Sequence, residues 1–290
     1  MKEPRDVTIA RAWAEINFHD RDIKLDGEPL SLPATLLTSA QAKSDKGLAL
    51  GIATATLYLA PHRLAGEVLG GRFARVNLCP KATVGCRNPC IYLTGRGRFS
   101  SPQRARIARA VWYLLDGEGF AQTLHYELER FAASAKRKGY KRIGQRLNGT
   151  SDIRWYKRFP WLAGVSGVTP YDYTKQAVML ASDSPERKAG VHMTYSRSET
   201  NWRDCEAILD AGLGNVAVVL DMPRSAPMPK GILDGDLTDW RPGDAGPGRL
   251  VGLRAKGTNA DKQRMRDSGF SIPPHALACY PRYHRHAVQG

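Results

Sequence analysis

The sequence has no apolar run that approaches the roughly 20 residues needed to cross a bilayer, so we predict no membrane-spanning segment. It also lacks a secretory signal, because the N-terminal residues are mostly charged and a mixed segment follows them instead of an apolar one. No internal repeat and no Gly-x-Gly-x-x-Gly, Walker, zinc-protease or Gly-x-Ser-x-Gly pattern occurs. The first two absences predict a cytoplasmic protein with no membrane partner, and the third leaves the function without a common motif.

Acidic residues are scarce relative to basic ones. The 290 residues include 43 Lys and Arg but only 28 Asp and Glu, which gives a formal net charge of +15. A positive excess favours a polyanionic partner, because Lys and Arg release counterions from phosphate backbones when they bind. A soluble protein that simply carries extra Lys and Arg is the alternative. Hydrophobic residues make up 42%, an ordinary globular value that argues against a disordered chain.

Cysteine is also rare, and its placement is uneven. The chain has five cysteines, and three of them, Cys79, Cys86 and Cys90, lie within one short segment. An extracellular disulfide framework would spread an even number of cysteines along a much shorter chain. We therefore predict a reducing compartment and a metal site on this segment.

The three cysteines form a C-x6-C-x3-C loop that contains two prolines and a glycine. Three thiolates on one loop can bind a soft metal and leave a fourth position open. With an iron–sulfur cluster, three cysteines leave one iron of a cubane free for an external ligand. With zinc, Cys205, Cys279 or a histidine would have to complete the tetrahedron. Both metals remain open at this point, as do three thiols without a metal.

Beyond the cysteines, short candidate strands alternate with helical segments. This alternation predicts an α/β fold with mostly parallel β/α repeats that form a partial or TIM-like barrel. The candidate strands cover residues 73–78, 142–147, 165–171, 191–195, 216–220, 232–237 and 250–253. The candidate helices cover residues 101–115, 117–137, 174–181 and 202–211.

The chain divides into three parts on this interpretation. Residues 1–72 form an irregular N-terminal extension, in which the apolar stretch 48–60 fits either strands or a short helix. Residues 73–260 form the β/α core with the cysteine site, and residues 261–290 form a basic C-terminal tail.

Polar side chains follow most of the predicted strands. In α/β folds the carboxyl ends of parallel strands share one face, so we expect these side chains to converge there with the cysteine loop. Several of them have a structural alternative as helix caps or turn residues. The expected catalytic residues are Asp152, Asp172 and Tyr195, and the expected cofactor-binding residues are Asn148, Arg197, Arg254 and Lys256.

Basic residues cluster between the cysteine loop and the next strand, with aromatic residues among them. This density predicts a surface that contacts the DNA backbone, although a solvated charged face is the usual explanation of such residues. The expected nucleic-acid-binding residues are Arg104, Arg106, Arg109, Lys136, Arg137 and Lys138.

Several segments resemble the phage gene product 88 family, which is often described as associated with rolling-circle replication. The similar segments are Asn77–Thr83 with Cys86 and Cys90–Tyr92, then Arg146–Asp152, Tyr171–Lys175 and Tyr195–Glu199. The resemblance covers about residues 73–257. It departs after Cys90, where Ile91-Tyr92-Leu93 stands in place of the family's usual Cys-Tyr-Ala continuation. It implies a phage or prophage protein of DNA metabolism in the cytoplasm of a bacterial host.

The expected architecture is also similar to that of radical S-adenosylmethionine enzymes. In that class a three-cysteine loop after the first barrel strand holds a cubane cluster whose free iron binds the cofactor. The spacing of 6 and 3 residues here differs from the usual 3 and 2 of that class, so the similarity concerns architecture and not the motif. It implies S-adenosylmethionine as a candidate cofactor.

Our leading hypothesis is a phage protein that acts on or alongside DNA and carries an iron–sulfur cluster, with a radical-S-adenosylmethionine-like enzyme as one form of it. A second hypothesis is a non-catalytic DNA-binding protein with structural zinc. A third is a replication nickase that uses Tyr280 or Tyr283 beside His284 and His286 near the C-terminus.

Overall fold

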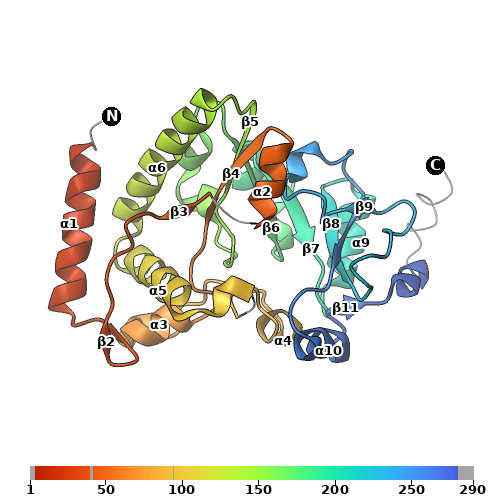
Figure 1. Cartoon of the computed structure of the whole chain (residues 1–290), viewed down its shortest axis with the longest axis horizontal. Helices are drawn as coiled ribbons and strands as arrows, with labels where there is room; N and C mark the ends of the chain where they lie inside the picture. The colour runs from red at the N-terminus through yellow and green to blue at the C-terminus, as the bar shows by residue number, and fades with distance from the viewer. Residues whose placement is uncertain (1–3, 40–41, 94, 280–290) are drawn as a thin grey trace.

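The fold combines one mostly parallel sheet with flanking helices (Figure 1), in a computed structural model that describes residues 4–39, 42–93 and 95–279. The strands are β1 (Lys24–Leu25), β2 (Glu28–Pro29), β3 (Leu37–Thr38), β4 (Ile52–Leu57), β5 (Arg142–Arg146), β6 (Thr169–Thr174), β7 (His192–Ser196), β8 (Asn215–Leu220), β9 (Leu233–Asp234), β10 (Leu250–Arg254) and β11 (Ser271–Ile272). The α-helices are α1 (Arg5–Asp20), α2 (Ala42–Ala49), α3 (Leu64–Leu69), α4 (Val84–Arg87), α5 (Ser100–Leu115), α6 (Gly117–Arg137), α7 (Trp155–Arg158), α8 (Pro185–Lys188), α9 (Trp202–Asp210) and α10 (Asn259–Asp267). The short 3₁₀ helices are η1 (Gly71–Phe73), η2 (Gly95–Arg98), η3 (Pro160–Ala163), η4 (Ala177–Met179), η5 (Arg241–Gly243) and η6 (Pro274–Cys279).

The main sheet has nine strands in the order β3-β4-β5-β6-β7-β8-β10-β9, and β11 also pairs with β8. All these pairings are parallel except that of β3 with β4. The prediction of an α/β fold with a mostly parallel sheet is confirmed. Among the described strands, β3 and β9 end the sheet without pairing to each other, so the sheet is open and the predicted TIM-like closure is not formed.

The first parallel strand lies earlier in the chain than the sequence predicted. The strand expected over 73–78 is wrong, because Phe73 ends η1 and its carbonyl accepts a turn hydrogen bond from the Val76 N–H. The strand is instead β4, whose six residues are all buried and which pairs with β5. The expected boundary at residue 72 therefore does not separate an extension from the sheet.

The C-terminal part of the chain also contributes to the fold. Helix α10 starts with a capping box, in which Thr258 and Asp261 exchange hydrogen bonds, and β11 adds its two residues to the edge of β8. Residues 259–272 are thus integrated in the structure instead of belonging to a tail. The predicted nickase residues, Tyr280, Tyr283, His284 and His286, lie outside the described residues.

Most other elements match the sequence-based predictions. Strands β5, β7, β8 and β10 and helices α5, α6 and α9 fall where they were expected. Strand β6 begins later and runs to Thr174, so the helix predicted over 174–181 is reduced to η4. The candidate strand 232–237 contributes only the two residues of β9.

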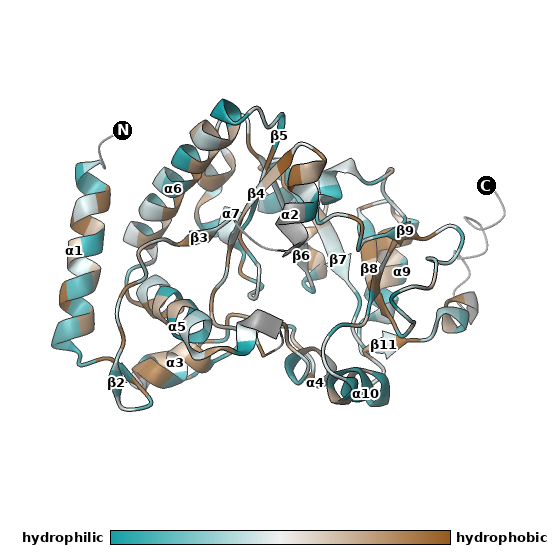
Figure 2. Cartoon of the chain, viewed as in Figure 1, coloured by the Kyte–Doolittle hydropathy of each residue, from teal (hydrophilic) through white to brown (hydrophobic). Residues whose placement is uncertain are grey.

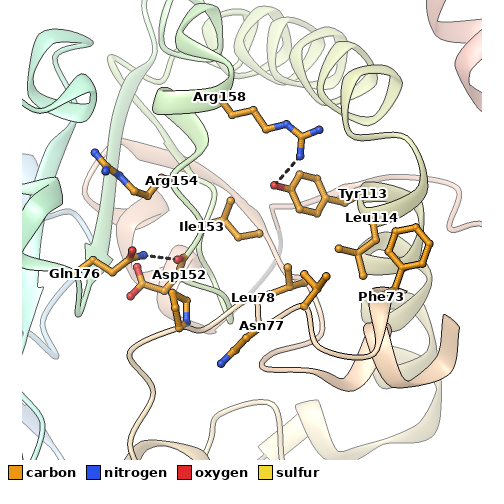
Figure 3. A pocket seen from close by; sticks show the side chains of 12 residues that line it. Phe73, Asn77, Leu78, Tyr113, Leu114, Asp152, Ile153, Arg154, Arg158 and Gln176 are labelled. Carbon is orange, nitrogen blue, oxygen red and sulfur yellow. Dashed lines mark hydrogen bonds between the residues drawn. The ribbon is translucent and has the colours of Figure 1, made fainter. Parts of the chain in front are cut away.

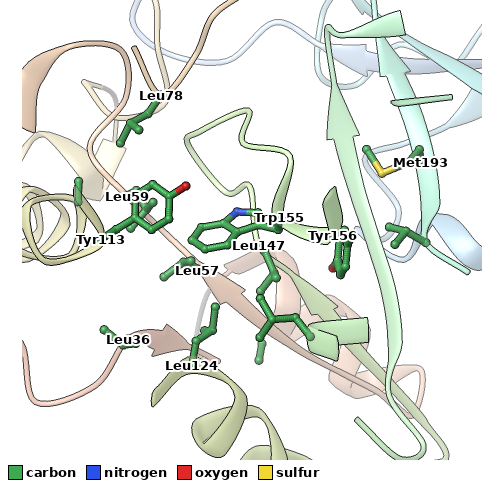
Figure 4. Close-up of a cluster of buried hydrophobic side chains, with 14 of the residues drawn as sticks. Leu36, Leu57, Leu59, Leu78, Tyr113, Leu124, Leu147, Trp155, Tyr156 and Met193 are labelled. Carbon is green, nitrogen blue, oxygen red and sulfur yellow. The ribbon is translucent and has the colours of Figure 1, made fainter. Parts of the chain in front are cut away.

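The core lies between the sheet and helices α5 and α6, with α1 packed on the outer side of α6 (Figure 1). Leu57, Leu124, Trp155 and neighbouring apolar side chains fill this layer (Figure 4). The Trp155 ring centroid is 4.9 Å from that of Tyr113 and 6.0 Å from that of Phe120. Strand β8 and helix α3 stand out as apolar segments in Figure 2. No helix in the described part of the chain is long and apolar enough to span a bilayer.

One carboxylate fastens the N-terminal segment to α6. The Glu127 carboxylate accepts hydrogen bonds from the backbone N–H groups of Leu36 and Leu37, at 2.8 and 3.0 Å. It also accepts one from the Arg11 guanidinium at 2.7 Å, so α1, β3 and α6 meet at this side chain. The largely buried carboxylate thus ties residues 5–38 to the body of the protein.

Replacing Glu127 with Ala should destabilise the whole fold. The change leaves the N–H groups of Leu36 and Leu37 without their carboxylate acceptor and removes the ion pair with Arg11, which costs about 3 kcal/mol of unfolding free energy. Denaturant unfolding followed by circular dichroism measures the loss. The exposed Glu129 on the same helix is the matched control, and Glu129→Ala should change stability by less than about 0.5 kcal/mol. Equal stability of the two variants would contradict the proposed fastening.

Candidate functional site

The cysteine loop lies over the carboxyl ends of β5, β6 and β7. The Cys79 thiol is 3.5 Å from the carbonyl oxygen of Thr150, which follows β5. Lys175, directly after β6, forms a hydrogen bond with Cys86. Glu199, which follows β7, accepts hydrogen bonds from the loop itself. The predicted convergence of the cysteines with the strand ends is therefore present.

The three thiols are close enough to influence one another electrostatically. The pKa of Cys79 rises to about 12, mainly because of burial, and the neighbouring Cys90 and Cys86 add to the rise. Burial also raises the pKa of Cys90. A backbone hydrogen bond opposes this rise, and the neighbouring Cys86 adds to it. The backbone N–H groups of His62 and Tyr92 donate to Cys79 and Cys90 respectively. Each of these two sulfur atoms thus has a backbone donor.

Lys175 is a site residue that the predictions did not single out. Burial alone would lower its pKa, but the charge of Cys86 and that of Asp152, together with the hydrogen bond to Cys86, raise the pKa overall. Its ammonium nitrogen also lies 5.7 Å from the centroid of the Phe270 ring. The lysine is therefore held as a cation beside the cysteines. Its place in the Tyr171–Lys175 segment, which resembles the family, was the available sequence signal.

Glu199 is the second residue that the predictions missed. One of its carboxylate oxygens accepts from the Thr83 hydroxyl at 2.7 Å, and the other from the Gly85 N–H at 2.8 Å. Both donors lie at the start of α4, the short helix that carries Cys86. A side chain at Gly85 would not fit, because its Cβ would come within 2.6 Å of the Ser268 hydroxyl. The cysteine loop is thus clamped between Glu199 and the end of α10.

Asp152 is the predicted catalytic residue that lies beside the cysteines. Its two carboxylate oxygens accept from the Thr174 hydroxyl at 2.7 Å and from the Lys175 N–H at 3.0 Å. Burial raises its pKa, and its charge acts on both Cys79 and Lys175. Asp152 therefore links the ends of β5 and β6 at the edge of the cysteine loop.

Asp172 is fully buried and joins neighbouring strands. One carboxylate oxygen accepts from the N–H groups of Leu147 and Asn148, at 2.9 and 2.7 Å. The other lies 3.5 Å from the Arg146 guanidinium, and burial raises the pKa of Asp172 to about 7. These contacts give the carboxylate a structural task at the β5–β6 junction.

Tyr195 is likewise engaged by the fold. Its hydroxyl lies 3.1 Å from an Asp204 carboxylate oxygen and 3.2 Å from the Asn201 amide nitrogen, at the start of α9. Burial raises the pKa of Tyr195 above its ordinary value. The side chain has no exposed surface and so does not face a ligand in this structure.

The predicted cofactor-binding residues contact other parts of the protein. Asn148 organises the turn after β5, with its side-chain oxygen accepting from Ser151 and Ile153. Arg197 donates to the carbonyl oxygens of Gly269 and Phe270. The two remaining residues form ion pairs around β9, in which Arg254 lies 3.0 Å from Asp234 and Lys256 lies 2.7 Å from Asp236.

The predicted DNA-binding arginines of α5 have partners within the chain. Arg104 donates to carbonyl oxygens of the β1–β2 hairpin, and Arg109 donates to that of Thr35 at 2.9 Å. Arg106 stacks over Tyr58 and Tyr92, with centroid distances of 4.9 and 5.6 Å. Three other predicted residues remain exposed at the end of α6, namely Lys136, Arg137 and Lys138.

The described side chains, including those of Cys79, Cys86 and Cys90, form no ready set of ligands for a metal ion. Among them, no group of three or more His, Cys, Asp and Glu has the spacing to hold one metal ion. Cys205, a predicted fourth ligand, is buried on α9, and its sulfur lies 3.8 Å from the Asn201 side-chain oxygen. The side chain of Cys279 lies outside the described part of the structure.

A cavity of about 430 Å³ opens beside the first cysteine of the loop (Figure 3). Its walls come from the segment before and after Cys79, from the end of α5 and from the chain that follows β5. Apolar side chains form most of the lining, with Arg158 at one end and Asp152 and Gln176 at the other (Figure 3). The cavity therefore extends from Arg158 to the residues that flank Cys79, and none of the three cysteines is among its lining residues.

The structure defines an α/β protein with a cysteine loop and an adjoining cavity at the carboxyl edge of an open, mostly parallel sheet. The family model named Gene product 88 matches residues 34–272, which is most of the chain. The chain belongs to this family, so the predicted resemblance is confirmed. The match includes β3 and β4, in agreement with their place in the sheet. No curated protein and no solved structure matches the chain.

Asp172→Asn should change how stability depends on pH. The pKa of Asp172 is about 7 in the folded protein, against 3.8 ordinarily. Between about pH 4 and about pH 7 the folded chain thus keeps a proton that the unfolded chain has released, and stability falls as pH rises. Relative to Asp172→Asn, wild type should lose up to about 1.4 kcal/mol per pH unit across this window. Parallel pH profiles of the two proteins in denaturant unfolding would contradict this.

Proposed function

We propose that this Gene product 88 protein holds an iron–sulfur cluster on Cys79, Cys86 and Cys90. The observation that carries the proposal is the position of three mutually interacting thiols over the carboxyl ends of β5, β6 and β7. Ligands of parallel α/β sheets bind at this edge. Cysteine thiolates are the protein ligands of such clusters.

The surroundings of the sulfur atoms support a cluster. Hydrogen bonds to cluster sulfurs stabilise their negative charge, and the N–H groups of His62 and Tyr92 and the Lys175 ammonium are such donors here. A cubane binds each cysteine through a different iron, whereas the ligands of zinc converge on one ion. Among the described side chains, no group of three or more converges on one metal ion. This argues against zinc but does not argue against a cluster.

The proposal assigns a task to each polar residue at the loop. When bound, a cluster with three protein ligands supplies an iron that can coordinate an external ligand, for which S-adenosylmethionine is our candidate. Lys175 would balance the negative charge of the thiolates, and Asp152 would hold Lys175 in position through its backbone N–H. Glu199 would keep α4, and with it Cys86, in place.

Iron analysis of protein purified without oxygen tests this proposal. Wild type should be brown and contain iron and sulfide in stoichiometric amounts, and Cys86→Ala should lose most of both because one of three ligands is gone. Cys205→Ala is the matched control, since Cys205 lies on α9 away from the loop, and it should keep its iron. Addition of S-adenosylmethionine should change the electron paramagnetic resonance spectrum of the reduced wild type.

Colourless wild-type protein that carries stoichiometric zinc would overturn the cluster. Equal iron loss in Cys86→Ala and Cys205→Ala would also count against it, because the loop would then have no special part in binding.

DNA binding is a second candidate function, and it rests on the exposed end of α6. Lys136, Arg137 and Lys138 follow one another there and are exposed. None of them forms an ion pair within the described residues, and the Lys136 ammonium donates to the Ser166 carbonyl oxygen at 3.0 Å. Three adjacent cations can contact consecutive phosphates and release counterions. This cluster replaces the α5 arginines as the most accessible part of the predicted DNA surface.

Changing Lys136, Arg137 and Lys138 together to Gln should weaken DNA binding. The slope of log affinity against log salt should become shallower by about 0.9 for each duplex phosphate that the variant no longer neutralises. Fluorescence anisotropy across a salt series measures this. A variant with Lys188, Arg224 and Lys230 changed to Gln loses the same net charge elsewhere on the exposed surface and should keep the wild-type slope. Equal slopes in both variants would remove the α6 end from the hypothesis.

A further inference from the structure

We infer that the cavity beside Cys79 binds an organic anion, a small molecule with an apolar body and one carboxylate or phosphate group, which Arg158 recognises. This inference deepens the proposed function, since it names the substrate class of the cleft next to the cysteine loop. The charges and the shape of the cavity support the inference, and neither depends on a cluster.

Arg158 is the charged group of the cavity that lacks a carboxylate partner within the described residues. Arg154, which also lines the cavity, forms two hydrogen bonds with the buried Glu186 carboxylate, at 3.0 and 2.8 Å. The Asp152 carboxylate accepts from the Thr174 hydroxyl and the Lys175 N–H. Among the described residues, the Arg158 guanidinium donates one side-chain hydrogen bond, to the Tyr113 hydroxyl at 3.4 Å. Its charge is therefore available to a ligand.

The Arg158 side chain is exposed, and its guanidinium packs against aromatic rings and the start of α6. It stacks on the rings of Tyr113 and Phe159, with centroid distances of 5.4 and 4.9 Å. It also lies against the start of α6, where a Cβ at Gly117 would come within 2.6 Å of the guanidinium nitrogen Nη2. Arginine recognises carboxylates and phosphates through paired N–H donors.

The rest of the cavity suits an apolar body. Phe73, Leu78, Leu114 and Ile153 line it between Arg158 and the cysteine loop (Figure 3). A volume of about 430 Å³ accommodates a ring or short chain together with its anionic group. At the far end, Asn77 and Gln176 can contact a polar substituent. A ligand anchored at Arg158 would therefore present its other end to the segment that carries Cys79.

Calorimetric titration with simple probes tests the inference. Phenyl phosphate and phenylacetate carry the two possible anionic groups, benzyl alcohol carries neither, and inorganic phosphate lacks the apolar body. At least one aromatic anion should bind wild type, and more tightly than benzyl alcohol and inorganic phosphate do. Arg158→Gln should weaken its binding at least tenfold, and Arg158→Lys should weaken it less. Arg224→Gln, a change at an exposed arginine outside the cavity, should leave the affinity unchanged.

Three results would overturn the inference. The first is no binding of either aromatic anion at millimolar concentration. The second is equal loss of affinity in Arg158→Gln and Arg224→Gln, which would indicate a general effect of charge. The third is inorganic phosphate binding as tightly as the tighter-binding of the two aromatic anions. The same titration on Cys86→Ala separates this inference from the cluster, because the cavity should keep its affinity in a variant that has lost iron.

Discussion

Two charged side chains that follow neighbouring strands hold the cysteine loop in place, Lys175 after β6 and Glu199 after β7. Glu199 binds the start of α4 through Gly85, and Lys175 binds Cys86 within the same helix. Without these contacts, ordering such a loop would cost backbone entropy that a helix of four residues cannot offset. The position of the thiols therefore depends on the order of strands in the sheet, which brings residues distant in the sequence to one edge.

The polar residues at the strand ends show how far a sequence can predict a site. Asp152 and the cysteines were predicted and do lie together, whereas Asp172 and Tyr195 serve the junctions between strands and helices. The backbone N–H groups at the ends of parallel strands need acceptors. A buried carboxylate can serve as such an acceptor just as well as it can serve as a catalytic group. Residue type and spacing cannot separate the two tasks, because only the neighbouring strand decides which donors a side chain meets.

The fold was predictable where strands and helices alternate regularly, and it was not predictable before residue 79. Strand β4 consists largely of alternating Ala and Thr and is buried on both faces, so it lacks the contrast between a strongly apolar and an exposed polar face that marks a half-buried strand. Its identity as a strand comes from pairing with β5, which lies far along the chain. The two residues of β3 depend in the same way on Glu127 of α6. Such long-range partners leave no local signal.

Some of the basic residues that make the chain positive stabilise the fold itself. Arg104, Arg109 and Arg197 donate to backbone carbonyl oxygens of loops and hairpins, and these acceptors carry no formal negative charge. An arginine used in this way adds to the net charge without an ion pair to an Asp or Glu, and Arg109 and Arg197 are also buried. Net charge by itself is thus a weak argument for a polyanionic partner. Stronger arguments come from cations whose surroundings leave them available, at the exposed end of α6 and, in the cavity beside Cys79, at Arg158.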